Sequence, residues 1–401
     1  MPVIALRSKI RFDRNELSGA FGDIGTDLPL IVGLVLTCGL SPASTLTLFG
    51  SLQILTGLLY RMPMPVQPLK AVAVIMITQR LSPAVLYGGG LAIALCMLAL
   101  SLTGALSFLA RAIPKAVVRG IQFGLGLQLC LLAMKDYLPA EAAAGYFLAT
   151  GCFVVGFILL GNRRLPPAIP VIGIGIAYAF THKLDVVDFG RSFEFHAPSL
   201  YVPALDDVLQ GLVLLALPQV PLSIANSVLA TTQSIRDFFP ERRITPRRIG
   251  LTYAMMNLIS PFFAGIPVCH GSGGLAGHYG FGARTGGSVI LYGSLYVTLG
   301  LFFSNGFRTL VNIFPLPVLA VCLLFEGMAL VWLMSDLVRP AGAAAGGVAT
   351  GDSRQMKWTD SFVAILVGLI SAGIPNGYAV GLAVGWILCA ARNRIEAGKR
   401  T

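Results

Sequence analysis

The amino-acid sequence predicts an all-α protein that crosses a lipid bilayer about fourteen times. Of its 401 residues, 55% are hydrophobic and 12% are charged, about half the charged fraction of a typical soluble domain. Several stretches are free of Asp, Glu, Lys and Arg and exceed the ~20 apolar residues that a spanning helix needs. Five such stretches are Leu28–Tyr60, Leu81–Ala110, Val208–Ser234, Thr285–Gly306 and Ser361–Ala391.

Helices rather than a β-barrel are expected, because the backbone in lipid must satisfy its own hydrogen bonds. The apolar stretches also lack the alternating polarity of a barrel strand. The third and tenth predicted spans are short. The spans are placed at residues 17–39, 42–60, 68–80, 83–110, 116–134, 142–161, 166–181, 206–230, 248–264, 272–281, 286–304, 309–334, 359–373 and 376–391.

The net charge of +11 is explained by basic cytoplasmic loops. Lys70 falls inside the membrane. With a cytoplasmic N-terminus, the extracytoplasmic segments hold few of the 29 Lys and Arg residues, namely Arg80, Lys135, Lys183, Arg191 and Arg308. This bias predicts a multi-pass protein of the inner (plasma) membrane with both termini in the cytoplasm, and no nucleic-acid partner is needed to explain the charge.

The chain shows a weak internal repeat. Met64–Pro68 follows the second span and Ile266–His270 follows the ninth, and each precedes a short, interrupted segment. Asp27–Leu30 in the first span similarly matches Gln219–Leu222 in the eighth. Seven spans in each half would place the two halves in opposite orientations. Short Gly/Pro-interrupted segments at matching positions of two such halves indicate a transporter binding site.

The repeat divides the chain into five segments. We expect a cytoplasmic N-terminal segment at 1–16, a first seven-span repeat at 17–181, an extracytoplasmic loop at 182–205, an inverted second repeat at 206–391 and a cytoplasmic tail at 392–401. The N-terminal segment lacks the apolar core of a secretory signal peptide. Because the tail is short, no soluble domain is expected after the last span.

Five motifs carry a family resemblance, and they are Gly22–Thr26, Pro63–Lys70, Pro218–Leu222, Pro267–Ala276 and Phe281–Gly286. In this order they resemble the molybdate transporter family, a divergent branch of the sulfate permease superfamily. The resemblance implies two inverted seven-span repeats arranged as a core and a gate domain, with half-helices as the third and tenth spans. It also implies a secondary transporter that imports molybdate, without the cytoplasmic regulatory domain of most sulfate permeases.

The first interrupted segment contains an intramembrane cation. The three prolines of Pro63–Pro68 forbid a continuous helix, and a helix that starts at Pro68 leaves its first amides free. Lys70 then opposes the helix dipole and costs roughly 2.5–3.5 kcal/mol to insert. An anion that binds at Lys70 would explain these costs. The alternative is that Lys70 extends to an interface or pairs permanently with Asp23 or Asp27.

Gly271–Gly274 is the counterpart in the second half, and its small residues suit an anion at a helix start. Two helix starts contribute roughly +0.5 each, so with Lys70 the sum of about +2 matches a divalent tetrahedral oxyanion. The alternative role of the glycines is close helix packing. The predicted substrate-binding residues are Thr26, Gln67, Lys70, Gln219, Asn226, His270, Gly271, Ser272, Gly273 and Gly274.

Asp23 and Asp27 are four residues apart and share one face of the predicted first span. Two ionised carboxylates there would repel each other, so one of them can hold a proton. The pair is therefore a candidate for proton coupling or for a counter-charge to Lys70, unless it forms a permanent structural pair. Glu326 also lies within a span, in a presumed gate helix, and no role is predicted for it.

No enzyme, cofactor or metal site is predicted. The sequence has no HExxH, GxSxG or P-loop motif. The seven cysteines lack a CxxC pair, and Cys269 with His270 alone does not make a metal site. The expected partners are the lipid bilayer and an oxyanion, with a proton as candidate co-substrate and a homodimer left open.

Three other functions are weighed against molybdate import. A sulfate or tungstate transporter of the same fold would bind an anion of similar charge and shape. An anion channel of the same fold would carry a steady, uncoupled current. A nucleobase–proton symporter ranks last, because such symporters use a carboxylate where this sequence has Gln219, Asn226 and Gly271–Gly274.

Overall fold

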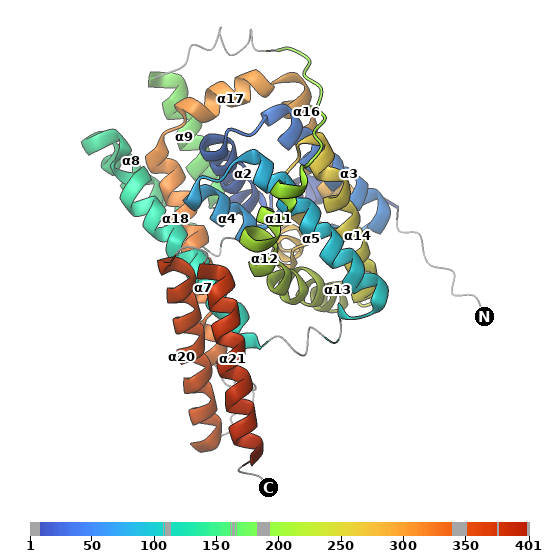
Figure 1. Ribbon diagram of the computed structural model, residues 1–401. Coiled ribbons are helices and arrows are strands. Elements are labelled where there is room, and N and C mark those ends of the chain that lie inside the picture. The colour runs from blue at the N-terminus through green and yellow to red at the C-terminus, as the bar shows by residue number, and fades with distance from the viewer. Residues whose placement is uncertain are drawn as a thin grey trace, which may run out of the picture.

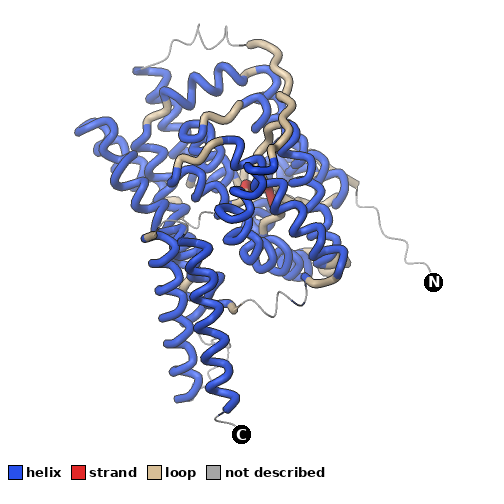
Figure 2. Tube along the Cα trace, in the orientation of Figure 1, coloured by secondary structure: helices blue, strands red, loops and turns tan. Residues whose placement is uncertain are grey.

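Two strands of two residues each lie at the centre of an otherwise helical computed structural model (Figure 2). The structure describes residues 9–106, 108, 114–160, 162, 165, 167–182, 193–338, 351–374 and 377–398. β1 (Gln67–Pro68) and β2 (Val268–Cys269) are antiparallel, with Gln67 opposite Cys269 and Pro68 opposite Val268. The pairing joins the two short segments that the internal repeat singled out.

Helices surround this centre on all sides (Figure 1). Before β2 they are α1 (Arg14–Ala20), α2 (Ile24–Cys38), α3 (Pro42–Tyr60), α4 (Lys70–Gln79), α5 (Pro83–Thr103), α7 (Lys115–Leu132), α8 (Ala142–Ile158), α9 (Ala168–His182), α11 (Leu205–Gly211), α12 (Leu217–Leu222), α13 (Thr231–Phe238) and α14 (Pro246–Ile259). After β2 they are α15 (Ser272–Gly280), α16 (Gly287–Phe302), α17 (Ser304–Ile313), α18 (Leu316–Trp332), α19 (Ser335–Val338), α20 (Gly351–Gly373) and α21 (Gly377–Gly398).

Within the described residues, four helical segments are long and apolar enough to cross a membrane, and they are Pro42–Tyr60, Pro83–Thr103, Lys115–Ile158 and Leu205–Phe238. Two bent pairs pass the same test together, α1 with α2 at 41° and α16 with the first part of α17 at 94°. Several other helices are apolar but shorter. The number of fourteen spans therefore stays a prediction.

Two predicted spans are interrupted in the structure. The first, 17–39, is divided between α1 and α2, so Asp23 is the residue that precedes α2 rather than part of one continuous helix. The twelfth, 309–334, is divided between α17 and α18. Pro315 explains the second division, because a proline inside a helix removes a backbone donor and clashes with the preceding turn.

A side-chain amide bonds the backbone at or directly before each central strand. Gln53 of α3 donates to the Val66 carbonyl at 2.7 Å and accepts from the Val66 amide at 3.0 Å. Asn257 of α14 makes the same two bonds with Val268, at 2.6 and 2.7 Å. Both amides are fully buried, so the interrupted backbone finds its partners inside the protein rather than in water.

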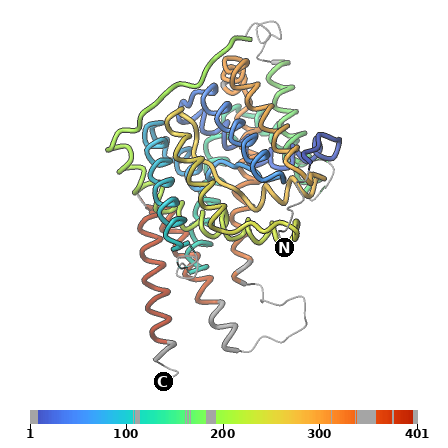
Figure 3. Tube along the Cα trace, turned by 90° about the vertical axis from the view of Figure 1, so that its right-hand side faces the viewer, coloured from blue at the N-terminus to red at the C-terminus, as the bar shows by residue number. Residues whose placement is uncertain are grey.

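Helices from the two halves of the chain pack against each other. α3 lies along α16, and α5 lies along α14. A Cβ atom on Gly50 of α3 would lie 2.4 Å from the Gly293 carbonyl of α16, and one on Gly293 would lie 2.4 Å from the Gly50 carbonyl. The two backbones can approach this closely only without side chains. α20 and α21 form a hairpin that extends beyond the other helices (Figures 1 and 3).

The helical segment Leu205–Phe238 contains two prolines, Pro218 and Pro221. π-helical turns flank them, η3 at Leu212–Ala216 and η4 at Ser223–Ala230. Because a proline has no N–H, it breaks the regular hydrogen-bond ladder, and wider turns accommodate the break. This irregular helix is what brings Gln219 and Asn226 to the centre of the molecule.

Glu16 anchors α1 to the start of α16. Its side chain is fully buried. Oε1 accepts from the amides of Arg284 and Thr285 at 2.9 and 2.8 Å, and Oε2 accepts from the amide of Ser288 at 3.0 Å. A carboxylate at the start of a helix also interacts favourably with the helix dipole.

We predict that Glu16→Ala lowers the thermal unfolding midpoint by several degrees, measured by circular dichroism in detergent. Each of the three buried amides that lose their acceptor costs about 1–3 kcal/mol. Glu16→Gln keeps an acceptor oxygen and should be intermediate, and Glu194→Ala, at an exposed carboxylate, should have little effect. An unchanged midpoint for Glu16→Ala would show that the three bonds do not hold α1 in place.

Candidate functional site

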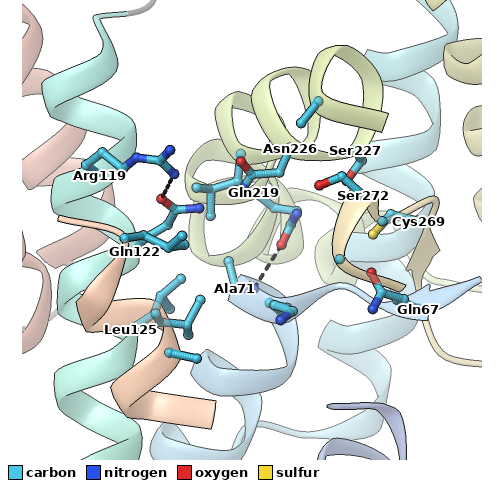
Figure 4. Close-up of a pocket in the computed structure, with 18 residues that line it drawn as sticks. Gln67, Ala71, Arg119, Gln122, Leu125, Gln219, Asn226, Ser227, Cys269 and Ser272 are labelled. Atoms are coloured by element: carbon cyan, nitrogen blue, oxygen red, sulfur yellow. Dashed lines mark hydrogen bonds between the residues drawn. The ribbon is translucent and has the colours of Figure 1, made fainter. Parts of the chain in front are cut away.

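A cavity of about 330 Å³ lies beside the starts of α4 and α15 (Figure 4). It is lined by residues of β1, α4, α7, α12, η4, β2, α15 and α18 and of the turns beside them. They are Gln67, Lys70, Ala71, Arg119, Gln122, Leu125, Gln219, Leu222, Asn226, Ser227, Ala230, Cys269, Gly271, Ser272, Gly273, Ala329, Leu330 and Leu333.

The cavity brings together most of the predicted substrate-binding residues. They are Gln67, Lys70, Gln219, Asn226, Gly271, Ser272 and Gly273. Thr26, His270 and Gly274 do not line it. His270 is fully buried, with Nδ1 3.0 Å from the Pro65 carbonyl and Nε2 2.9 Å from Thr252 Oγ1. Its ring therefore supports the segment before α4 rather than facing the cavity.

The start of α15 presents backbone amides to the cavity. Gly271 is the residue before the helix, and the first intrahelical bond runs from the Leu275 amide to the Gly271 carbonyl at 3.1 Å. The amides of Ser272 and Gly273 precede that bond and have no partner within the helix. A helix start of this kind is a ready site for an anion.

The two glycines at this start have different surroundings. A Cβ atom on Gly273 would meet no atom within 4 Å, so this residue faces open space. A Cβ atom on Gly271 would lie 1.4 Å from Oε1 of Gln67, so only glycine fits there. Gly274 faces away from the cavity, because its Cβ would lie 2.3 Å from Asp23 Oδ2. Gly273 is the position from which a side chain would enter the cavity.

The start of α4 differs from the start of α15. Oε1 of Gln219 accepts from the amides of Ala71 and Val72 at 3.1 and 3.3 Å (Figure 4). Nε2 of Gln219 donates to Ser223 Oγ at 3.0 Å, and Ser223 Oγ lies 2.8 Å from the Tyr253 hydroxyl. The amides that the sequence left free for an anion are thus capped by a fixed side chain.

Lys70 has a carboxylate partner that the sequence did not predict. Its Nζ lies 2.6 Å from Oε1 of Glu326, on α18. The alternatives weighed for Lys70 were an interface or a pair with Asp23 or Asp27. The observed ion pair corrects them and gives Glu326 a role. Sequence reasoning missed it because α4 and α18 are distant in the chain and no local pattern links them.

The two aspartates lie behind the central strands. Asp23 is almost completely buried, and its Oδ1 accepts from Nε2 of Gln67 at 2.8 Å. Asp27, in the first turn of α2, is fully buried. Because Gln67 contacts both Asp23 and the cavity, it connects the aspartate region with the space in front of α15.

Arg119 of α7 is a cavity residue that the sequence analysis missed. Its Nη1 donates to Oε1 of Gln122 at 2.8 Å, so α7 presents both side chains to the cavity (Figure 4). Arg119 also lines a neighbouring cavity of about 230 Å³ together with Lys115 and Asn226. It falls inside the predicted span 116–134. That position was the signal that could have identified it.

The charges around the cavity favour a small anion. Lys70 pairs with Glu326, and Arg119 and the positive end of α15 also line the space. A guanidinium and helix amides together recognise oxyanions well. Within the described residues, no three His, Cys, Asp or Glu side chains are grouped as a metal site.

Comparisons with known proteins point to transporters. A family model described as "Molybdate transporter of MFS superfamily" matches residues 15–129 and 211–330. Molybdate transporter 2 of Arabidopsis thaliana is 34% identical over 386 residues, which cover 83% of this chain and 82% of that protein. Molybdate transporter 1 of Chlamydomonas reinhardtii is 26% identical over 488 residues, covering 93% and 94%.

Solved structures identify the fold. The transmembrane domain of the cyanobacterial bicarbonate transporter BicA superposes with a TM-score of 0.63 at 16% identity, over 91% of this chain and 99% of that chain. The murine anion transporter Slc26a9 in its inward-facing state gives a TM-score of 0.65 at 15% identity, over 97% and 69%. The fold is thus the one shared by BicA and the SLC26 proteins.

Proposed function

Because this chain belongs to the molybdate transporter family, we propose that it is a secondary transporter that imports molybdate. The family assignment confirms the resemblance predicted from the five motifs, and the relatives are transporters rather than enzymes. It is a multi-pass membrane protein with the BicA and SLC26 fold. We further place it in the inner (plasma) membrane with both termini in the cytoplasm, as the basic loops predict.

One observation carries the proposal, and it is the cavity between the open start of α15 and Arg119. A tetrahedral dianion there would accept hydrogen bonds from the amides of Ser272 and Gly273 and from the guanidinium. Gln67 and Asn226 would supply neutral donors from opposite sides (Figure 4).

We propose in addition that the chain consists of two inverted repeats and that the binding site lies at their interface. Gln53 with Val66 and Asn257 with Val268 make matching pairs of bonds, and the packing of α3 on α16 is matched by that of α5 on α14. Such correspondences are expected of two seven-span repeats of opposite orientation. Substrate sites of repeat-built transporters lie at the repeat interface, near the bilayer midplane.

Proton co-transport would supply the driving force. Moving a dianion into a cell against the membrane potential costs about 5 kcal/mol per 100 mV. Asp23, Asp27 and Glu326 are buried, and Lys70 supplies a positive charge beside them. Buried carboxylates in membrane proteins commonly form proton relays. We therefore propose that Asp23 and Asp27 take part in coupling transport to protons.

The proposal is tested by uptake of radiolabelled molybdate into proteoliposomes, with sulfate as competitor and an imposed proton gradient. Saturable uptake that a proton gradient stimulates supports a coupled molybdate transporter. Preference for sulfate would reassign the substrate within the same fold. A steady anion current without coupling would identify a channel instead.

We predict that Lys70→Ala abolishes saturable uptake while the protein still inserts and purifies. The substitution removes a cation that lines the cavity and leaves the buried carboxylate of Glu326 without its partner. Lys135→Ala, a lysine outside the cavity lining, serves as the matched control. Uptake by Lys70→Ala with an unchanged KM would mean that Lys70 has a structural role only.

We predict that Asp23→Asn and Asp27→Asn weaken the pH dependence of uptake, compared at about pH 5.5 and about pH 7.5. If these carboxylates carry the coupled proton, wild-type uptake is faster with the acidic medium outside, and an amide cannot carry that proton. Glu194→Asn is the control for loss of a carboxylate. Full pH dependence in both aspartate variants would remove them from the coupling mechanism.

We predict that Gly273→Val weakens molybdate binding about tenfold or more, because one lost charge-assisted hydrogen bond is worth about 1.5–3 kcal/mol. The Cβ atom of the new side chain would lie on the cavity side, with no protein atom within 4 Å. Gly280→Val is the matched control, since Gly280 also faces open space on α15 but does not line the cavity. Binding is measured by calorimetry.

Thermal unfolding separates this effect from a loss of structure. Valine has a higher helix propensity than glycine, so both variants should unfold at or above the wild-type midpoint. Gly271→Ala should unfold earlier, because its Cβ would overlap Gln67. Wild-type affinity in Gly273→Val would mean that the amides of α15 do not hold the anion.

A further inference from the structure

Glu326 stands between two cavities. On one side is the large cavity that Lys70 lines. On the other side is a cavity of about 230 Å³ that Glu326 itself lines, between α2, α8, α9 and α18. Apart from the thiol of Cys322, Thr26 and Glu326 contribute its polar side chains, and the remaining lining is glycine and apolar residues. The ion pair between Lys70 and Glu326 therefore links the two spaces.

The two carboxylate oxygens of Glu326 have different partners. Oε1 lies 2.6 Å from Nζ of Lys70, and Oε2 lies 3.5 Å from Oγ1 of Thr26. The contact with Lys70 is short, whereas the contact with Thr26 is at the limit of a hydrogen bond. A small rotation of the side chain towards the second cavity would lengthen the first contact and shorten the second.

An oxyanion in the large cavity would meet a cation that Glu326 already contacts. Lys70 has one positive charge, and its exposed part faces the large cavity. A dianion that approaches Lys70 would lie close to an ionised carboxylate, and like charges at that separation repel strongly in a poorly solvated site. The oxyanion and the carboxylate of Glu326 therefore cannot both keep a close contact with Nζ of Lys70. The second cavity gives the side chain of Glu326 a place to move to.

We propose that Glu326 is an internal competitor that the substrate displaces from Lys70. The arriving oxyanion takes over the lysine, and the carboxylate turns into the second cavity, where Thr26 donates a hydrogen bond to it. This inference rests on the proposed function of the large cavity. It assigns Thr26 to the displaced carboxylate rather than to the substrate, and it gives Glu326 the role of setting affinity.

The exchange also changes which helices are joined. The observed ion pair connects α4 with α18, and the displaced carboxylate would connect α2 with α18 through Thr26. Substrate binding would then replace one polar contact to α18 with another. The affinity for substrate would equal its intrinsic affinity for Lys70 reduced by the strength of the contact it must break.

A different role for Glu326 predicts an effect of the opposite sign. If Glu326 only held Lys70 in position, removing its charge would loosen the lysine and weaken binding. If it competes, removing its charge frees the lysine and strengthens binding. The sign of the change in affinity therefore distinguishes the two roles without any measurement of transport.

The test is molybdate binding to the purified full-length protein, measured by calorimetry. Glu326→Gln keeps the size of the side chain and removes its charge, and we expect about tenfold tighter binding, within the range typical of coupled sites. Glu326→Asp shortens the side chain and should also bind more tightly, which covers the case in which the glutamine variant does not fold. Glu194→Gln is the control and should bind like the wild type.

Thr26→Val completes a double-mutant cycle, which isolates the coupling between two residues. In the wild-type background it should weaken binding severalfold, because the displaced carboxylate loses its donor. In the Glu326→Gln background it should have no effect. If Thr26 touched the substrate directly, it would weaken binding in both backgrounds.

The outcomes keep the two proposals apart. Absence of molybdate binding by the wild type would overturn the proposed function itself. Wild-type binding with weaker or unchanged affinity in Glu326→Gln and Glu326→Asp would overturn only the competition. Tighter binding in these variants, together with loss of the Thr26→Val effect, would support it.

Discussion

A backbone that is interrupted inside a membrane protein must find hydrogen-bond partners without water, and the centre of this molecule follows from that requirement. Gln53 bonds both backbone groups of Val66, the residue before β1, and Asn257 bonds both backbone groups of Val268 in β2. The strands then pair with each other, so two short helices can begin at the centre of the fold. Without these amides the breaks would expose buried polar groups, and the helix starts beside the cavity would not be held in place.

The starts of α4 and α15 both follow a short central strand, but their backbone amides have different partners. Gln219 caps the start of α4 by accepting hydrogen bonds from two of its amides. The side chain of Gln219 is in turn held by the hydroxyl of Ser223, which contacts the hydroxyl of Tyr253. Among the residues that the structure describes, no side chain caps the start of α15. The two helix starts therefore differ, and in the proposed function only the start of α15 receives the ligand. In the proposed site, the start of α15 is the helix start that remains for the anion, and Arg119 lines the same cavity.

Local patterns in the sequence singled out segments that the structure brings together at its centre. Prolines, glycines and an intramembrane lysine are rare enough in apolar helices to be noticed singly, and the cavity gathers residues chosen on that basis, Gln67 and Gly273 among them. The sequence could not reveal partners that depend on distant helices. The pairing of Lys70 with Glu326 is of this kind. So is the inward position of His270, a residue whose neighbours in sequence face the cavity.

Glu16 shows how a helix start of this fold holds an oxyanion when the anion is part of the chain. Three amides contact its carboxylate at 2.8–3.0 Å, the geometry that a dissolved oxyanion would need at α15. The difference is the tether. A covalently attached carboxylate has a very high effective concentration, so no solute can replace it. In the proposed site at α15, a free anion would bind at its concentration in solution and could dissociate again. The same kind of contact is therefore permanent between Glu16 and the start of α16 and would be reversible at α15.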